Sequence, residues 1–146
     1  MTGKLKRNIL IFFIAIVLIG VITGYMMWNK PHLDVKAAEA AKVTAIDLYK
    51  TFTTDSAGAK LKYLNKVVAV AGEVKQVSLN QQNQQIILLK THDPDASVNC
   101  TMEENRNNIK AGDTIVVKGI CSGYINGDIG MGLPGDVFLI RCYIST

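Results

Sequence analysis

One long apolar run restricts this chain more than any other feature of its sequence. The twenty residues from Ile9 to Trp28 contain no charged side chain. As a helix they would span about 30 Å, which is the thickness of the hydrocarbon core of a bilayer. We therefore predict a transmembrane anchor over residues 9–28, with Ile9 and Trp28 at its ends and the lipid bilayer as its partner.

Basic residues precede this run and predict its orientation. Lys4, Lys6 and Arg7 lie within residues 1–8, and by the positive-inside rule this short segment stays in the cytoplasm. We expect a single-pass protein of the inner (cytoplasmic) membrane whose remaining residues are extracytoplasmic. A cleaved signal peptide is the alternative, but its apolar region usually has only ~7–15 residues, and no Ala-x-Ala site follows here.

A linker and an amphipathic helix are expected next. The juxtamembrane linker covers residues 29–43, and we expect residues 35–42 to be helical or a semi-rigid spacer. Thr44 and Asp47 then resemble a capping box. Apolar residues follow at the spacing of one helical face: Ala45, Leu48, Tyr49 and Phe52. We expect this face to pack against the chain's own domain, with the binding of a partner helix as the alternative.

The rest of the chain has the pattern of a small β domain. The first run, Lys66–Leu79, is rich in β-branched residues, and its apolar phase slips by one after Val74, as in a strand with a bulge. Four shorter runs follow, at residues 85–90, 98–102, 114–121 and 137–144, with a short helix expected at 103–109 and a loop at 122–135.

The order of these elements predicts the fold class. Three strands, a short helix and two more strands, with a long curled first strand, are typical of a mainly β protein with a five-stranded OB-fold Greek-key barrel. We expect this domain, with its N-terminal helices, to cover residues 44–146. In the last strand Arg141 should face solvent, which would turn four apolar residues toward the core: Phe138, Ile140, Cys142 and Ile144.

The positive net charge of +4 lies outside the predicted barrel. Residues 1–64 carry nine Lys and Arg against four Asp and Glu, whereas residues 65–146 carry seven against eight. The barrel therefore lacks the cationic field that attracts nucleic acid.

Four segments of the chain resemble one family. They are residues 63–74 (Tyr-Leu-Asn-Lys-Val-Val-Ala-Val-Ala-Gly-Glu-Val), 98–101 (Val-Asn-Cys-Thr), 109–124 (from Ile-Lys-Ala-Gly-Asp to Cys-Ser-Gly-Tyr) and 137–144 (Val-Phe-Leu-Ile-Arg-Cys-Tyr-Ile). From Thr44 onward the chain resembles the tRNA_anti-like family of bacterial OB-fold proteins, most of them membrane-anchored or exported. The resemblance implies an OB barrel similar to anticodon-binding domains.

Three cysteines fall in the domain that we expect to be exported, where disulfides are permitted. Their number is odd, so at least one is unpaired, and all three could equally be small apolar residues of strands. On the topology that the resemblance implies, Cys100 and Cys142 lie on neighbouring parallel strands and are the best candidates for a disulfide. Cys121 lies at the opposite end and is expected to be free.

No constellation for catalysis is visible in the sequence. His32 and His92 lie in separate segments without a further ligand at metal-binding spacing, and no serine has a nearby base. Asp93-Pro94-Asp95 is first of all a turn. We therefore predict a protein without enzymatic activity, and nominate no catalytic, metal-binding or cofactor-binding residue.

A ligand surface is predicted from the fold class instead. OB domains usually bind through the outer face of strands two and three and the adjoining loops, which here would present Gln82, Asn83, Asn99, Thr101, Tyr124 and Asn126. This set is polar, nearly uncharged and poor in aromatic residues. It suits an envelope protein or a glycan better than phosphate. A single-stranded nucleic acid, which the resemblance implies, is the alternative partner.

Overall fold

The computed structural model describes residues 2–28 and 34–145, which belong to two compact units, Met1–Leu33 and Asp34–Thr146. Residues 29–33 of the predicted linker lie outside the described residues.

The first unit contains one helix, α1 (Thr2–Trp28). Its stretch Arg7–Trp28 is long and apolar enough to cross a membrane. Ile9 is 54% exposed and Trp28 is 94% exposed, as expected of side chains that have no protein core to enter. The predicted helix is confirmed, whereas its insertion into a membrane and its orientation stay predictions.

The second unit is mainly β. Its described elements are, in chain order, β1 (Ala41–Thr44), α2 (Ala45–Thr54), α3 (Ser56–Tyr63), β2 (Val67–Leu79), β3 (Gln85–Lys90), β4 (Ser97–Met102), β5 (Thr114–Ile125), the 3-10 helix η1 (Ile129–Met131) and β6 (Asp136–Ser145).

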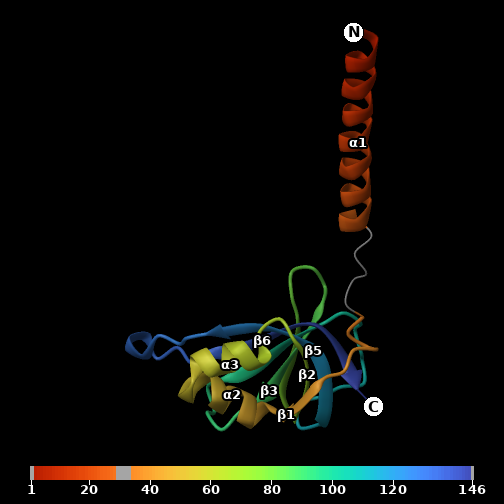
Figure 1. Ribbon diagram of the computed structural model, residues 1–146. Helices are drawn as coiled ribbons and strands as arrows, with labels where there is room; N and C mark the ends of the chain where they lie inside the picture. Colours follow the sequence, from red (N-terminus) through yellow and green to blue (C-terminus); the bar gives the residue numbers. More distant parts are fainter. Residues whose placement is uncertain (1, 29–33, 146) are drawn as a thin grey trace. The chain divides into compact units, whose positions relative to one another are not determined.

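Five of the strands close into a barrel (Figure 1). Their order is β2-β3-β4-β6-β5, and β2 pairs again with β5 to complete the circle. β4 and β6 run parallel, while the other neighbours in the barrel are antiparallel. The prediction of a five-stranded OB-fold barrel is confirmed.

The long strand β2 belongs to both halves of the barrel. Its first half pairs with β5 and its second half with β3, and the register shifts between Val74 and Gln76. This is the bulge that the phase slip predicts. A side chain at Gly72, just before the bulge, would place its Cβ 3.0 Å from Cβ of Ala45 and 3.3 Å from Cβ of Leu89. The glycine therefore allows β2 to lie close to both α2 and β3.

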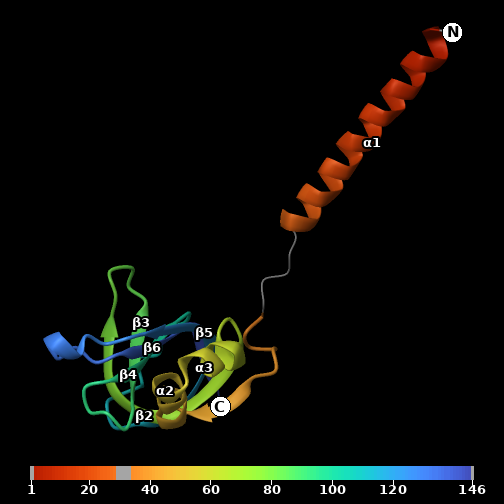
Figure 2. The same cartoon turned by 60° about the vertical axis from the view of Figure 1, so that its left-hand side comes forward.

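α2 contributes its apolar face to the core. The Thr44 hydroxyl accepts a hydrogen bond from the Asp47 backbone N–H at 3.0 Å, so the predicted cap is formed. The four residues of the predicted stripe are all buried: Ala45, Leu48, Tyr49 and Phe52. α2 and α3 lie together beside the strands (Figure 2). The prediction that the stripe packs against the chain's own barrel is confirmed.

Two segments differ from the prediction. Residues 35–42 are not helical: Val35 lies buried in a turn, and Ala41–Thr44 forms β1, which pairs in parallel with β2 outside the barrel. The helix expected at 103–109 is wrong, since this segment consists of bends and turns. The backbone of Gln85 and Arg106 explains why. The Arg106 N–H donates to the Gln85 side-chain oxygen at 2.7 Å, and the Arg106 carbonyl accepts from the Gln85 side-chain nitrogen at 3.0 Å, so the Arg106 backbone bonds to β3 instead of to a helix. The Gln85 N–H in turn donates to the Asn105 side chain at 2.9 Å.

The outward and inward residues of β6 also differ from the prediction. Val137, Leu139 and Cys142 are buried, whereas Phe138 is half-buried and Ile140 is 42% exposed. Arg141 has a left-handed backbone, with φ of 52°, and forms a bulge in β6. The alternation of inward and outward side chains therefore shifts by one residue at this position. The pairing with β5 shifts at the same place, opposite Gly119. The loop after β5 is shorter than predicted, because β5 continues to Ile125.

Candidate functional site

The outer face of three barrel strands forms the best candidate for a binding surface. Burial alternates along β3, and along β4 from Val98 onward, so Ile86 and Leu88 face outward together with Asn99 and Thr101. The registers place these side chains in rows, with Ile86 opposite Thr101 and Leu88 opposite Asn99. The outward direction of Asn99 and Thr101 agrees with the prediction, and their role in binding stays a prediction.

β6 extends this surface with two residues that sequence reasoning placed in the core. Phe138 lies opposite Asn99 in the parallel pairing of β4 and β6, so the row continues from Leu88 through Asn99 to Phe138. Ile140 follows on the same side of β6. We call the uncharged part of this face the β3–β4–β6 surface, and it consists of Ile86, Leu88, Asn99, Thr101, Phe138 and Ile140. The same side of the strands continues with two charged residues, since Lys90 lies opposite Ser97, whose N–H and hydroxyl donate to Asp136.

The β2–β3 hairpin lies beside this surface and is held by its own amides. The Asn80 side-chain oxygen accepts from the backbone N–H groups of Gln82 and Gln84, both at 2.9 Å. Its side-chain nitrogen donates to the side-chain oxygens of the same two residues. The Asn83 carbonyl accepts from the Asn105 side chain at 2.9 Å. Gln82 therefore stabilises the hairpin. The Asn83 side chain is exposed and forms no hydrogen bond with the described part of the chain, so it is accessible to a ligand.

Tyr124 does not join the predicted ligand residues. It lies opposite Val137, which is buried, and so it points to the inner side of the sheet, away from Phe138. There it stacks on Phe52, with ring centroids 5.8 Å apart, and meets the edge of Tyr49 at 6.1 Å. Burial, with Tyr124 as a neighbour, raises the pKa of Tyr49 to about 12. Tyr124 is therefore a core residue beneath α2.

Asn126 begins the arm that joins β5 to β6. The arm extends away from the barrel (Figure 1) and ends in η1, where Asp128 accepts hydrogen bonds from Gly130 and Met131. Asn126 is exposed at its base. Of the six predicted ligand residues, the structure brings Asn99 and Thr101 together on the β3–β4–β6 surface, while Asn83 and Asn126 lie exposed in adjoining loops.

A cavity of about 310 Å³ lies at the end of β3. Lys75, Lys90 and His92 are among its lining residues. The Lys75 ammonium donates to the carbonyl of Pro94 at 2.7 Å, and Lys90 forms an ion pair with Glu73. Both cations therefore already have protein partners.

The three cysteines are buried free thiols in the structure. A hydrogen bond to the Cys100 thiol, together with burial, raises the pKa of the Cys142 thiol. The two side chains are therefore neighbours between β4 and β6, as expected for a candidate pair. Their oxidation to a disulfide stays a prediction.

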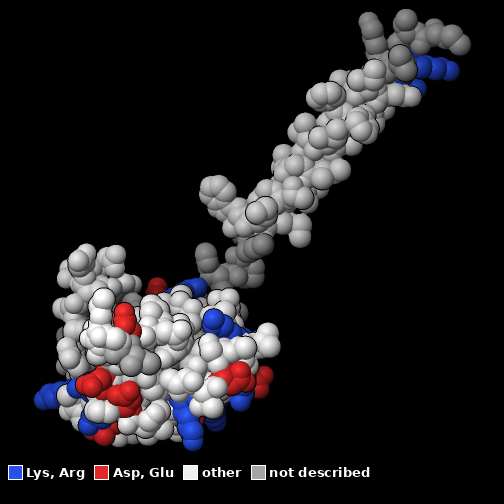
Figure 3. Space-filling model, turned by 90° about the vertical axis from the view of Figure 1, so that its left-hand side faces the viewer, with Lys and Arg blue, Asp and Glu red and all other residues white. Residues whose placement is uncertain are grey.

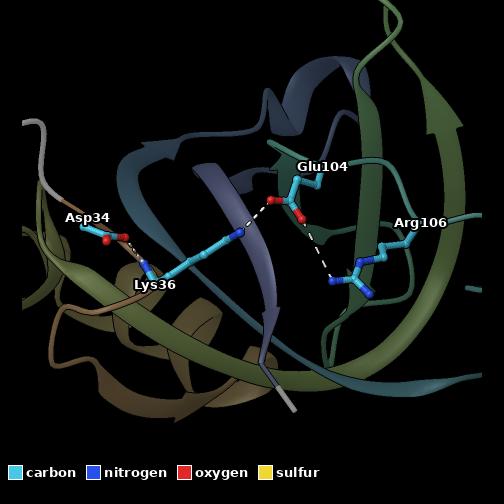
Figure 4. A network of polar contacts seen from close by, with 4 residues as sticks. All are labelled: Asp34, Lys36, Glu104 and Arg106. Atoms are coloured by element: carbon cyan, nitrogen blue, oxygen red, sulfur yellow. Dashed lines mark hydrogen bonds and ion pairs between the residues drawn. The ribbon is translucent and has the colours of Figure 1, made fainter.

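Two lysines hold the turn before β1 against the barrel, Lys36 (Figure 4) and Lys118. The Lys36 ammonium lies 2.6 Å from Oε1 of Glu104, whose other oxygen is 3.9 Å from Arg106, and it also lies 4.5 Å from the centre of the Tyr143 ring. Lys118 donates to the Lys36 carbonyl at 2.8 Å. The hydrogen bond between Lys36 and Glu104 raises the pKa of the lysine and lowers that of the glutamate. The unit thus begins with an ordered turn against β5 and β6.

The charges of the second unit are balanced. Residues 34–146 contain twelve Lys and Arg and twelve Asp and Glu, so the whole excess of +4 lies before Asp34. Figure 3 shows acidic and basic side chains interspersed over one face of this unit. Such a distribution lacks the continuous cationic track of proteins that bind nucleic acid without sequence preference.

Within residues 2–28 and 34–145, no three His, Cys, Asp or Glu side chains come together in a group that could hold a metal ion. The β3–β4–β6 surface itself carries amide, hydroxyl, aliphatic and aromatic groups, which can bind a ligand by hydrogen bonding and apolar contact.

Comparison with known proteins identifies a matching family. The model of the family described as tRNA_anti-like matches residues 1–131. A search of curated proteins found no significant match. Among similar solved structures is a crystal structure of what is described as an aspartyl-tRNA synthetase from Leishmania major Friedlin, with 8% identity and a TM-score of 0.43 over 81% of this chain. The match spans 22% of that protein's length.

Proposed function

The chain belongs to the tRNA_anti-like family, and on this premise we propose that it is a membrane-tethered OB-fold module that binds an envelope protein or a glycan and catalyses no reaction. In this proposal α1 anchors the chain in the cytoplasmic membrane, and the barrel lies on the extracytoplasmic side. The partner is held by the β3–β4–β6 surface.

The composition of that surface is the observation that carries the proposal. Four of its six side chains are large and apolar, namely Ile86, Leu88, Phe138 and Ile140, and the charged residues of the same face, Lys90 and Asp136, lie at its edge. Neighbouring apolar side chains with a polar rim are typical of protein-binding sites. The row Leu88–Asn99–Phe138 also offers an amide beside an aromatic ring, a combination that suits a sugar. The aliphatic majority favours a polypeptide.

Site-specific photo-crosslinking in the native membrane tests this proposal. A photoreactive phenylalanine analogue replaces Phe138 on the surface, and as a matched control it replaces Thr114, which is exposed on β5 outside the surface. We expect adducts from position 138 and none from position 114. An adduct that protease removes indicates a polypeptide, and one that a glycosidase removes indicates a glycan. Equal adducts from both positions, or none from either, would contradict the proposal.

A single-stranded nucleic acid is the second candidate, and Phe138 is the observation that favours it. An outward aromatic ring on an OB barrel can stack on a base, which contributes about 1–3 kcal/mol per base in known complexes. The balanced charge of residues 34–146 opposes this reading. Fluorescence anisotropy of the full chain in nanodiscs with labelled single strands at low salt should show negligible binding. Tight binding that weakens with salt and with Phe138→Ala would make single-stranded nucleic acid the preferred partner over an envelope protein or glycan.

A further inference from the structure

One leucine of α3 stands out from the barrel surface. Leu61 is 82% exposed, more than any other large apolar residue in the described part of the second unit. The opposite side of the same helix is fixed in the core, because Ala59 and Tyr63 are buried. Leu61 therefore projects from a firmly held helix.

Three lysines lie near this leucine in α3 and in the turn that follows it. Lys60 and Lys62 are its neighbours in the helix, and the Lys66 ammonium lies 3.0 Å from the Leu61 carbonyl. All three are exposed, and none forms an ion pair within the described part of the chain. We call Lys60, Leu61, Lys62 and Lys66 the α3 knob.

The local backbone keeps the knob in shape. The Asp55 carboxylate caps α3 by accepting from the Gly58 N–H at 2.9 Å, and it is the nearest acidic residue along the chain. At the other end the N–H groups of Leu64 and Lys66 donate to the carbonyls of Lys60 and Tyr63, both at 3.0 Å. A cationic patch with an apolar centre is thus built before any ligand arrives.

From this arrangement we propose that the α3 knob docks on the surface of an anionic lipid bilayer. Lysines near an anionic membrane are attracted to its headgroups, and an aliphatic side chain at their centre enters the boundary with the acyl chains. The proposal rests on the membrane tethering proposed above. Only five residues separate Trp28 from Asp34, so the tether keeps the barrel at high effective concentration near the bilayer, where a weak contact suffices.

The same features favour lipid over nucleic acid at this place. Single strands need an exposed aromatic ring for stacking, but Tyr63, the aromatic residue of α3, is only 4% exposed. The exposed apolar side chain of the knob is the aliphatic Leu61, which cannot stack on a base.

An environment-sensitive fluorophore tests the proposal. NBD is attached to Leu61→Cys in the full chain, since the three native cysteines are buried and should not be labelled. The chain is reconstituted in vesicles of phosphatidylcholine with or without phosphatidylglycerol. We expect a several-fold gain in NBD emission, with a blue shift, only when phosphatidylglycerol is present. NBD at Ala111→Cys, in the exposed turn before β5, should show no such gain.

Charge variants provide the matched control. Lys60→Glu combined with Lys62→Glu should abolish the gain, whereas Lys42→Glu combined with Lys110→Glu, with the same change in net charge, should retain it. No gain in anionic vesicles, an equal gain in both lipids, or a gain that single-stranded oligonucleotide produces without anionic lipid would overturn the proposal.

Alkaline carbonate extraction of the same vesicles tests tethering by α1 independently of docking by the α3 knob. Loss of the chain from the vesicles would contradict tethering by α1. If anionic vesicles added to that unanchored chain still increase the NBD emission, docking of the α3 knob on anionic lipid is supported.

Discussion

Arg141 determines which side chains of β6 face outward on the barrel. Its left-handed backbone, at φ 52°, turns Phe138 and Ile140 outward while Cys142 remains in the core. This bulge lies against Gly119 in β5. A Cβ at Gly119 would lie 2.5 Å from Sγ of Cys142 and 3.2 Å from the Ile140 carbonyl oxygen. The composition of the β3–β4–β6 surface therefore depends on the absence of a side chain at Gly119 in the neighbouring strand.

We predict that Gly119→Ala destabilises the protein by about 1–3 kcal/mol, the usual cost of overpacking a core. The cause is the contact with Cys142, so Cys142→Ala should relieve part of this cost. Urea unfolding of the two single variants and the double variant measures the coupling. Strictly additive effects would show that the sulfur is not the obstacle.

A second prediction at the residue scale concerns Cys100 and Cys142. They are neighbouring thiols in the structure, and in an oxidising compartment we expect them to form a disulfide, with their two electrons passing to the disulfide of an exported oxidoreductase. Thiol titration of the denatured, exported protein should return one free thiol. Cys121→Ser should return none, and three free thiols in the native sequence would refute the pairing.

The raised pKa values predict how these thiols react before denaturation. Burial raises the pKa of Cys121, and the hydrogen bond to Cys100 and burial raise that of Cys142. A raised pKa keeps each thiol neutral through neutral and mildly alkaline pH, and the neutral thiol is the poorer nucleophile. Alkylation of the reduced, folded protein should therefore be slow across this range and become fast in denaturant.

At the scale of elements, α2 belongs to the core of the barrel. It contacts four of the barrel strands as well as β1, and Phe52 packs against the rings of Tyr63 and Tyr124. A helix that closes a barrel in this way cannot at the same time offer its apolar face to another protein.

Phe52→Ala should lower the free energy of unfolding by about 3–5 kcal/mol, as expected for a large buried aromatic residue. Ile46→Ala is the control on the same helix, because Ile46 is 49% exposed, and it should change stability by about 0.5 kcal/mol or less. Chemical denaturation of both variants makes the comparison. Similar small effects for both would mean that α2 is only loosely attached.

At the scale of the whole molecule, the excess positive charge precedes the second unit. The cationic residues Lys4, Lys6 and Arg7 precede the apolar stretch of α1, and residues 34–146 are balanced. The chain thus combines a basic, apolar N-terminal part with an OB-fold domain of balanced charge.

This asymmetry predicts the topology of the full chain. A reporter enzyme that is active only after export should be active when fused after Thr146. Exchange of Lys4, Lys6 and Arg7 for Gln should lower that activity and raise the activity of a cytoplasmic reporter at the same site, because the orienting charge is lost. Cytoplasmic activity in the native sequence would contradict the predicted orientation.

Features with a local physical cause were predicted by the sequence alone. The apolar run specified a long helix, the Thr44–Asp47 pair specified the cap of α2, and the phase slip after Val74 specified the bulge in β2. Each depends on residues a few positions apart, within one helical turn or one strand. The outward direction of Asn99 and Thr101 followed from simple alternation for the same reason.

Only the tertiary structure decided which residues share the candidate binding surface. Phe138 lies on it because the register between β5 and β6 shifts at Arg141, opposite Gly119. Tyr124 does not, because a second shift between Cys121 and Gly123 places it opposite the buried Val137. The segment 103–109 lost its predicted helix because its backbone bonds to Gln85, and Ala41–Thr44 became a strand only by pairing with β2. These outcomes depend on contacts between distant segments of the chain, which periodicity along one segment does not encode.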